Sequence, residues 1–121
     1  MKKILIVEDE KAYLGLLHDQ LAKNGYDVMD AKDGEEGLKL ALDNKPDLIL
    51  LDLIMPKVGG IQMLKALRAD TWGKDASVFI LTNVNGSREL TEGMSNSVGL
   101  YIIKSDMKLD DLLWDIKVTL K

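Results

Sequence analysis

The 121-residue chain contains no cysteine and only one histidine, His18. The absence of cysteine excludes a disulfide framework, a thiolate zinc site and a cysteine nucleophile, and one histidine excludes a multi-histidine metal site. The chain has 16 Lys and Arg against 20 Asp and Glu, a formal net charge of −4, and no basic cluster. This balance removes the electrostatic attraction that dominates nucleic-acid binding, so we expect these residues not to bind DNA or RNA directly.

Long hydrophobic runs are also missing. The first run, Ile4-Leu5-Ile6-Val7, ends at Glu8 and is too short for a signal peptide. No run approaches the roughly 18 apolar residues that a membrane span requires. We therefore expect a cytoplasmic protein without membrane contact. With 46% apolar and 30% charged residues, a chain of this length is expected to fold as one domain over residues 1–121.

Short apolar runs alternate with longer segments of helical periodicity, which is typical of α/β proteins with a parallel sheet. The runs are nearly continuous Ile, Leu and Val, as expected for strands covered on both faces. This pattern predicts a doubly wound, five-stranded parallel sheet. The predicted strands are 4–7, 26–29, 47–51, 77–81 and 100–103.

Apolar residues at helical spacing predict about five helices between and after these strands. Gly25 should end the first helix, and Asp33 with Glu36 resembles a capping box at the start of the second. The segment 85–96 has few apolar residues and contains Gly86 and Gly93, so it should form a short or locally unstable helix. It is either a poorly formed edge helix or a mobile element that a signal could order. The apolar stripes of the other four are Tyr13, Leu17 and Leu21; Leu38, Ala41 and Leu42; Ile61, Leu64 and Leu67; and Leu109, Leu112, Leu113, Ile116 and Leu120.

Polar residues follow four of the predicted strands, at the edge where parallel α/β sheets carry their active crevice. An acidic cluster there repels phosphate unless a hard divalent cation such as Mg²⁺ lies between them. A carboxylate in such a cluster can also act as a nucleophile that accepts a phosphoryl group, while a hydroxyl and an amine stabilise its oxygens. The residues in question are Glu8-Asp9-Glu10, Asp52, Thr82-Asn83 and Lys104-Ser105.

Together these residues resemble the receiver domain of two-component response regulators, close to the chemotaxis regulators. Each motif is weak alone, but five in order along nearly the whole chain are specific. The motifs are Glu8-Asp9, Asp52 followed by Met55-Pro56 and Gly59, Thr82, Tyr101 and Lys104.

The resemblance implies a flavodoxin-like fold with strand order 2-1-3-4-5 and a metal-assisted phosphoacceptor site. Mg²⁺, or Mn²⁺, would contact Asp9, Asp52 and the main-chain carbonyl of Ile54 directly, and Glu8 mostly through water. Asp52 would accept a phosphoryl group from a histidine kinase, a phosphotransfer protein or a small phosphodonor, with Thr82 and Lys104 assisting. Such a domain is regulatory rather than a classical enzyme, although it assists its own phosphorylation and dephosphorylation.

The resemblance also implies how a signal leaves the domain. Thr82 would move to the phosphoryl group and Tyr101 would follow inward, which changes the surface of helix four, strand five and helix five. That surface would control an effector protein or an output domain, and a homodimer through it is a further expectation.

Two residues depart from the family pattern. Asn83 replaces a small residue, and Ser105 replaces a proline whose peptide bond is typically cis. A non-proline cis bond costs about 2.5–4 kcal/mol, so the Lys104–Ser105 bond should be trans. These departures leave open a phosphorylation-independent docking module, against which Asp52, Thr82 and Lys104 argue. A flavin-binding protein and an aspartyl phosphatase are disfavoured, because acids follow the first strand and Ile54 stands two residues after Asp52.

The positions of three further residues are also predicted. His18 is expected at the surface. Trp72 should cover the end of the third helix. Trp114 lies off the leucine stripe of the last helix, so it either flanks the core or marks a partner site.

Ile54 and Val84 generate a prediction about the lifetime of the phosphorylated state. Both are apolar where many receivers place polar residues that position the attacking water, so the phosphoryl group should be lost slowly. Ile54→Asn should shorten the aspartyl-phosphate lifetime, measured as decay of the phosphorylated mass after the phosphodonor is removed. An unchanged lifetime in this variant would show the idea to be wrong.

Overall fold

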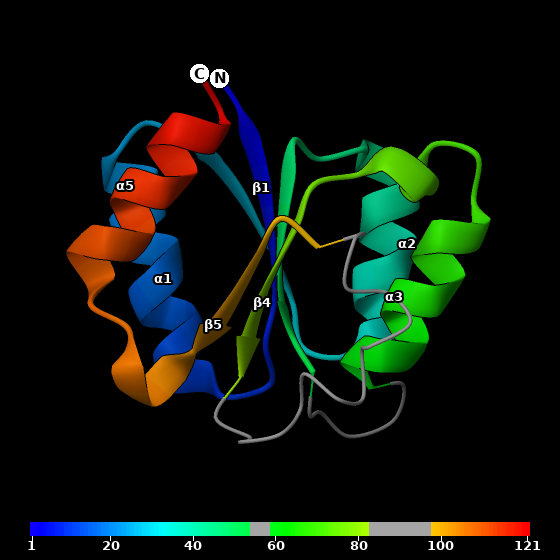
Figure 1. Cartoon of the computed structure of the whole chain (residues 1–121), viewed down its shortest axis with the longest axis horizontal. Coiled ribbons are helices and arrows are strands. Elements are labelled where there is room, and N and C mark those ends of the chain that lie inside the picture. The colour runs from blue at the N-terminus through cyan, green and yellow to red at the C-terminus, as the bar shows by residue number, and fades with distance from the viewer. Residues whose placement is uncertain (54–58, 83–97) are drawn as a thin grey trace.

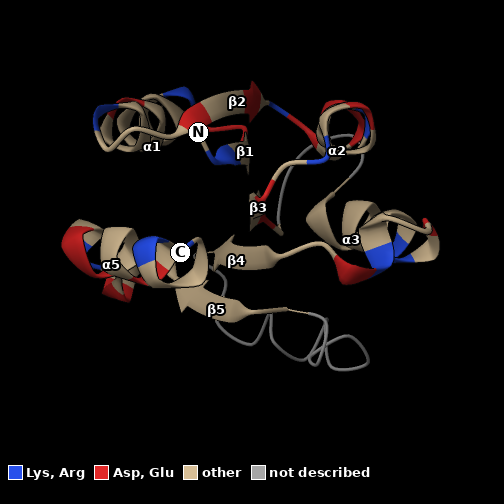
Figure 2. Ribbon diagram, turned by 90° about the horizontal axis from the view of Figure 1, so that it is seen from above, with Lys and Arg blue, Asp and Glu red and all other residues tan. Residues whose placement is uncertain are grey.

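The computed structural model describes residues 1–53, 59–82 and 98–121. Its centre is a parallel sheet in the order β2-β1-β3-β4-β5 (Figure 2), which confirms the predicted fold class and strand order. The strands are β1 Lys3–Val7, β2 Asp27–Ala31, β3 Leu48–Asp52, β4 Val78–Thr82 and β5 Leu100–Ile103.

Helices cover both faces of the sheet, as a doubly wound fold requires. In Figures 1 and 2, α1 and α5 lie on one face and α2 and α3 on the other. The helix predicted over 85–96 lies outside the described residues. The described helices are α1 Lys11–Lys23, α2 Gly34–Asn44, α3 Gly60–Ala69 and α5 Leu109–Thr119, with 3₁₀ turns η1 Gly73–Asp75 and η3 Lys104–Asp106.

Two hydrophobic clusters fill the space between the sheet and its helices. Leu5, Val7 and Ile80 belong to the first cluster, on the side of α2 and α3, whereas Ile4 and Leu81 belong to the second, on the side of α1 and α5. Successive strand residues point to opposite faces. Burial of both sets explains why the central strands are apolar without alternation.

Local signals in the sequence position the helix ends. Gly25 has a φ of +89° directly after α1, as its predicted role as a helix stop requires. The side chain of Asp33 accepts a hydrogen bond from the backbone N–H of Glu36 at 2.9 Å and caps α2. Trp72 packs against the first core cluster, which includes Leu67 of α3, as predicted.

Two remaining expectations concern the backbone. The described part of the chain contains no cis peptide bond, so Lys104–Ser105 is trans as predicted.

Edge strand β2 begins and ends later than its predicted range, because Asp27 and Asp30 interrupt its apolar pattern. None of the described helices is long and apolar enough to span a bilayer.

Gly60, the first residue of α3, holds that helix against the end of β3. Its backbone N–H donates to the carbonyl oxygen of Leu53 at 3.0 Å. A Cβ at this position would meet the carbonyl oxygen of Asp52 and lie 2.6 Å from the Cα of Leu53. These neighbours are backbone atoms, which cannot rotate away as a side chain can. Gly60 therefore permits the close approach that places α3 beside Asp52.

Gly60→Ala should lower the free energy of unfolding by about 2–3 kcal/mol, because the added methyl group forces the backbone of α3 and β3 apart. Gly15→Ala in α1 is the matched control, since its Cβ would meet nothing within 4 Å. That change should raise stability by up to about 1 kcal/mol through helix propensity. Urea unfolding followed by circular dichroism measures both; equal midpoints for the two variants would contradict the steric account.

Candidate functional site

Polar side chains gather at the carboxyl edge of the sheet, the end toward which the β4 and β5 arrows point in Figure 1. Glu8 follows β1, Asp52 ends β3, Thr82 ends β4 and Lys104 follows β5. Glu8, Asp52 and Thr82 are buried, at 2%, 7% and 0% exposure, whereas Asp9 is exposed. The parallel strands thus bring together the site residues predicted from strand ends.

The carboxylates of Glu8, Asp9 and Asp52 converge on one small volume. One oxygen of each lies within 4.8 Å of the others. Two oxygens on opposite sides of an octahedral Mg²⁺ are about 4.2 Å apart, because each lies about 2.1 Å from the ion. The spacing therefore suits one shared cation after small side-chain movements, and Asp9 leaves the cluster open to water on one side.

Lys104 crosses the site from β5 and joins two of the acids. Its Nζ donates to Oε2 of Glu8 at 2.7 Å and to Oδ2 of Asp52 at 3.4 Å. The side chains of all three are at most 9% exposed. Buried charges of this kind persist only when they are paired. One ammonium between three carboxylates leaves a negative excess in this part of the described structure.

The pKa of Glu8 is raised by its surroundings in the cluster. Burial raises the pKa of its carboxyl group from 4.5 to about 7, and the nearby charge of Asp52 adds to this effect, while the hydrogen bond from Lys104 opposes it. For Lys104, burial lowers the ammonium pKa, but the hydrogen bond to Glu8 and the charge of Asp52 outweigh it and raise the pKa. Lys104 is therefore charged throughout the neutral range, and Glu8 is poised to gain or lose a proton there.

Thr82 and Tyr101, the expected switch pair, lie on the same face of the sheet. Thr82 follows Ile80 by two residues, so its side chain points to the same face of the sheet, the face that the first cluster covers. Tyr101 in β5 is partly buried and packs against that cluster. Tyr101 pairs with Ile80 in the β4–β5 register. Ile54, Met55-Pro56, Asn83 and Val84 lie outside the described residues, so the expectations on them stay predictions.

Two contacts were missed by the sequence analysis. The Nζ of Lys104 lies 4.4 Å from the centre of the Tyr13 ring, a residue predicted only as core. His18, expected at the surface, is partly exposed and pairs with Asp30 at 2.8 Å. Neither contact had a local signal in the sequence, because each joins residues on different elements.

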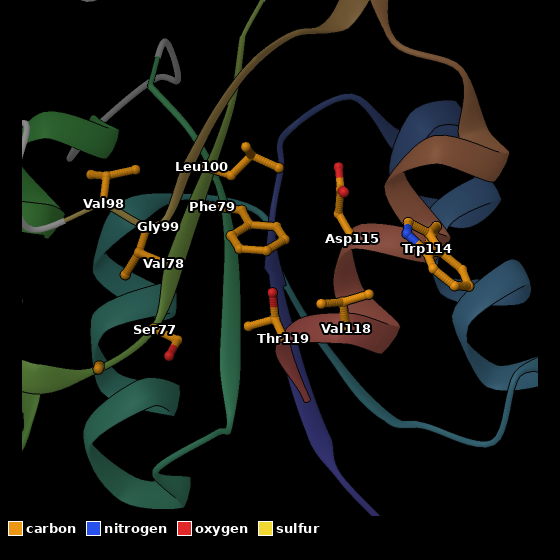
Figure 3. Close-up of a pocket in the computed structure, with 11 residues that line it drawn as sticks. Ser77, Val78, Phe79, Val98, Gly99, Leu100, Trp114, Asp115, Val118 and Thr119 are labelled. Carbon is orange, nitrogen blue, oxygen red and sulfur yellow. The ribbon is translucent and has the colours of Figure 1, made fainter. Parts of the chain in front are cut away.

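A separate hollow of about 410 Å³ lies at the opposite end of β4 and β5 (Figure 3). Val78, Phe79 and Leu100 line it from the strands, and Trp114 and Val118 from α5. Trp114 is 63% exposed, which argues against the core role considered for it. This hollow shares no residue with the acidic cluster.

Comparison with known proteins identifies relatives with similar sequences. A family model for the response regulator receiver domain matches residues 4–117. The DNA-binding dual master transcriptional regulator RpaA of Synechocystis is 34% identical over 121 residues, all of this chain and 50% of the relative. Response regulator MprA of Mycobacterium sp. strain KMS is 33% identical over 119 residues, 98% of this chain and 50% of the relative.

A solved structure with the same fold contains a bound ligand of its own. The response regulator TrrA of Thermotoga maritima, in complex with Mg²⁺ and BeF, superposes with a TM-score of 0.85 at 32% identity. The match covers 98% of this chain and 99% of that one.

The fold and site define a doubly wound α/β domain with a carboxylate and lysine centre at the carboxyl edge of its sheet. The chain belongs to the response regulator receiver domain family of two-component systems, whose members are phosphorylated signalling switches. It spans about half the length of the curated relatives that it matches along its whole length.

Glu8 generates a prediction about the pH dependence of Mg²⁺ binding. Below a pKa of about 7 the carboxyl group is protonated and no longer contributes negative charge to the site. Mg²⁺ affinity should therefore rise by up to about tenfold per pH unit as pH increases toward 7, and level off above it. Calorimetric titration with MgCl₂ between pH 5.5 and 8.5 measures this.

Glu8→Gln should bind Mg²⁺ more weakly at pH 8 and lose most of this pH dependence. Glu35→Gln, a change at an exposed position in the first turn of α2, is the matched control and should behave as the wild type does. A pH dependence that is equally steep in Glu8→Gln would show that another group causes it.

Proposed function

We propose that this domain is a switch that accepts a phosphoryl group on Asp52. The observation that carries the proposal is the position of this carboxylate: buried at the end of β3, 3.4 Å from the Nζ of Lys104, and beside two further carboxylates suited to a divalent cation. The family membership supports the same reading.

In the proposed reaction an oxygen of Asp52 forms a bond to phosphorus, and the bond from phosphorus to the donor's leaving atom breaks. Lys104 neutralises one phosphoryl oxygen, and the hydroxyl of Thr82 donates a hydrogen bond to another. Asp9, Asp52 and the main-chain carbonyl of Ile54 would hold Mg²⁺, or Mn²⁺, with Glu8 acting through water. The cation would supply charge neutralisation between these carboxylates and the incoming phosphoryl group.

Phosphorylation would then alter the ion pairs of the site. Lys104 contacts both Glu8 and Asp52 before the reaction, and a phosphoryl group on Asp52 offers it more negative charge. Movement of Lys104 toward that group would pull on the end of β5, where Tyr101 lies. Together with Thr82, this would change the surface that includes β5 and α5.

The partners follow from this chemistry. We propose a histidine kinase or a phosphotransfer protein as the donor, with small phosphodonors as substitutes. The signal would pass to an effector protein or an output domain, and a homodimer through the surface of helix four, β5 and α5 is part of the same proposal. The domain spanning residues 1–121 would act in the cytoplasm, would not bind nucleic acid directly, and would assist the loss of its own phosphoryl group.

Incubation with Mg²⁺ and acetyl phosphate should add the mass of one phosphoryl group to the intact protein. Asp52→Asn should abolish the gain because the amide cannot act as the acceptor. Asp43→Asn, which changes an exposed carboxylate paired with Lys39 on α2, is the matched control and should be phosphorylated normally.

A second measurement separates the switch from the docking module. Beryllofluoride binds where a phosphoryl group would attach, so wild-type protein should bind it in the presence of Mg²⁺ and Asp52→Asn should not. Absence of both the mass gain and beryllofluoride binding would favour a module that works by docking alone.

A further inference from the structure

Tyr13 contacts both ends of the turn that carries Lys104. Its ring centre lies 4.4 Å from the Nζ of Lys104, within the range of a cation–π interaction. Its hydroxyl donates to the Sδ of Met107 at 3.8 Å. Tyr13 is itself fixed, because it lies in the first turn of α1 and packs against the second core cluster.

Lys104 is the first residue of the short turn that follows β5. Residues Lys104–Asp106 form a single 3₁₀ turn, and the N–H of Met107 donates to the carbonyl of Lys104 at 3.3 Å, a long hydrogen bond. The backbone fixes only where the long lysine side chain starts, so its direction depends on what the ammonium group contacts.

The two carboxylates that hold the ammonium have other tasks in the proposed function. Glu8 contacts it at 2.7 Å and Asp52 at 3.4 Å, yet the first would serve the cation and the second would carry the phosphoryl group. The Tyr13 ring has no such competing role. Burial raises the pKa of its phenol above 10, so the ring stays neutral throughout the physiological range.

We infer that Tyr13 is a positioning residue that keeps the Lys104 ammonium directed at the phosphorylation site while its carboxylate partners change. This inference rests on the proposed function and deepens it. The ring provides an attraction that neither Mg²⁺ binding nor phosphorylation of Asp52 removes. The Met107 contact anchors the far end of the same turn.

The test compares two substitutions at this position with a control. Tyr13→Leu keeps an apolar side chain but removes the ring, so phosphorylation by acetyl phosphate at saturating Mg²⁺ should slow by roughly three- to thirtyfold. Tyr13→Phe keeps the ring and loses only the hydroxyl contact, so its rate should stay within about twofold of wild type. Tyr26→Leu is the matched control: Tyr26 packs against the same core cluster but precedes β2, at the opposite edge of the parallel sheet from Lys104, and its rate should not change.

A double-mutant comparison with Lys104 shows whether Tyr13 acts through the lysine or only stabilises the fold. In a Lys104→Met background, Tyr13→Leu should slow phosphorylation no further, because the ammonium that the ring holds is gone. Equal slowing in both backgrounds would overturn the inference, and so would an unchanged rate for Tyr13→Leu in the native background.

A spectroscopic measurement tests the contact without any phosphodonor. Ring currents should shift the ε-methylene protons of Lys104 upfield in wild type and Tyr13→Phe, and the shift should vanish in Tyr13→Leu. Its absence in wild type would contradict the contact. If wild type shows the shift but is not phosphorylated, the proposed function fails and the inference fails with it; phosphorylation of wild type with no effect of Tyr13→Leu overturns the inference alone.

Discussion

The structure depends on one electrostatic constraint: buried negative charge at the edge of the sheet must be balanced. Glu8 and Asp52 are nearly inaccessible, Asp9 lies beside them, and Lys104 pairs with the first two. Burying carboxylates is costly unless they are paired. Burial raises the pKa of Glu8, and the hydrogen bond from Lys104 offsets that rise only in part. Three carboxylates around one ammonium favour a cation at this site, and under the proposed function they would make it sensitive to a phosphoryl group on Asp52.

The parallel arrangement of the strands holds these charged residues close together. Because β1 and β3 are neighbours and both are parallel, Glu8 and Asp52 leave the sheet at the same edge. Lys104 reaches them from β5, across the end of β4. Core clusters on both faces pack against these strands, and the strand register places the charged side chains within reach of one another. Gly60 contributes by letting α3 begin directly against the backbone of Asp52.

The sequence predicted the sheet, and the placement of most candidate site residues at one of its edges, for physical reasons. Strands buried on both faces need continuous apolar runs, and polar residues at the ends of such runs share one edge when the strands are parallel. The limits of β2 were less accurate because an edge strand tolerates Asp30. The contact between Tyr13 and Lys104 was not predicted, because an aromatic residue in an apolar stripe fits the core equally well. Its second role depends on where the turn after β5 returns, which no local pattern encodes.

A crystal structure with Mg²⁺ and beryllofluoride tests the central claim most directly. The account predicts the cation among Glu8, Asp9 and Asp52, beryllium on an oxygen of Asp52, and the Lys104 ammonium moved from Glu8 to a fluoride while staying over the Tyr13 ring. A structure in which Mg²⁺ and beryllofluoride bind elsewhere, or in which Lys104 keeps its 2.7 Å contact with Glu8, would contradict it.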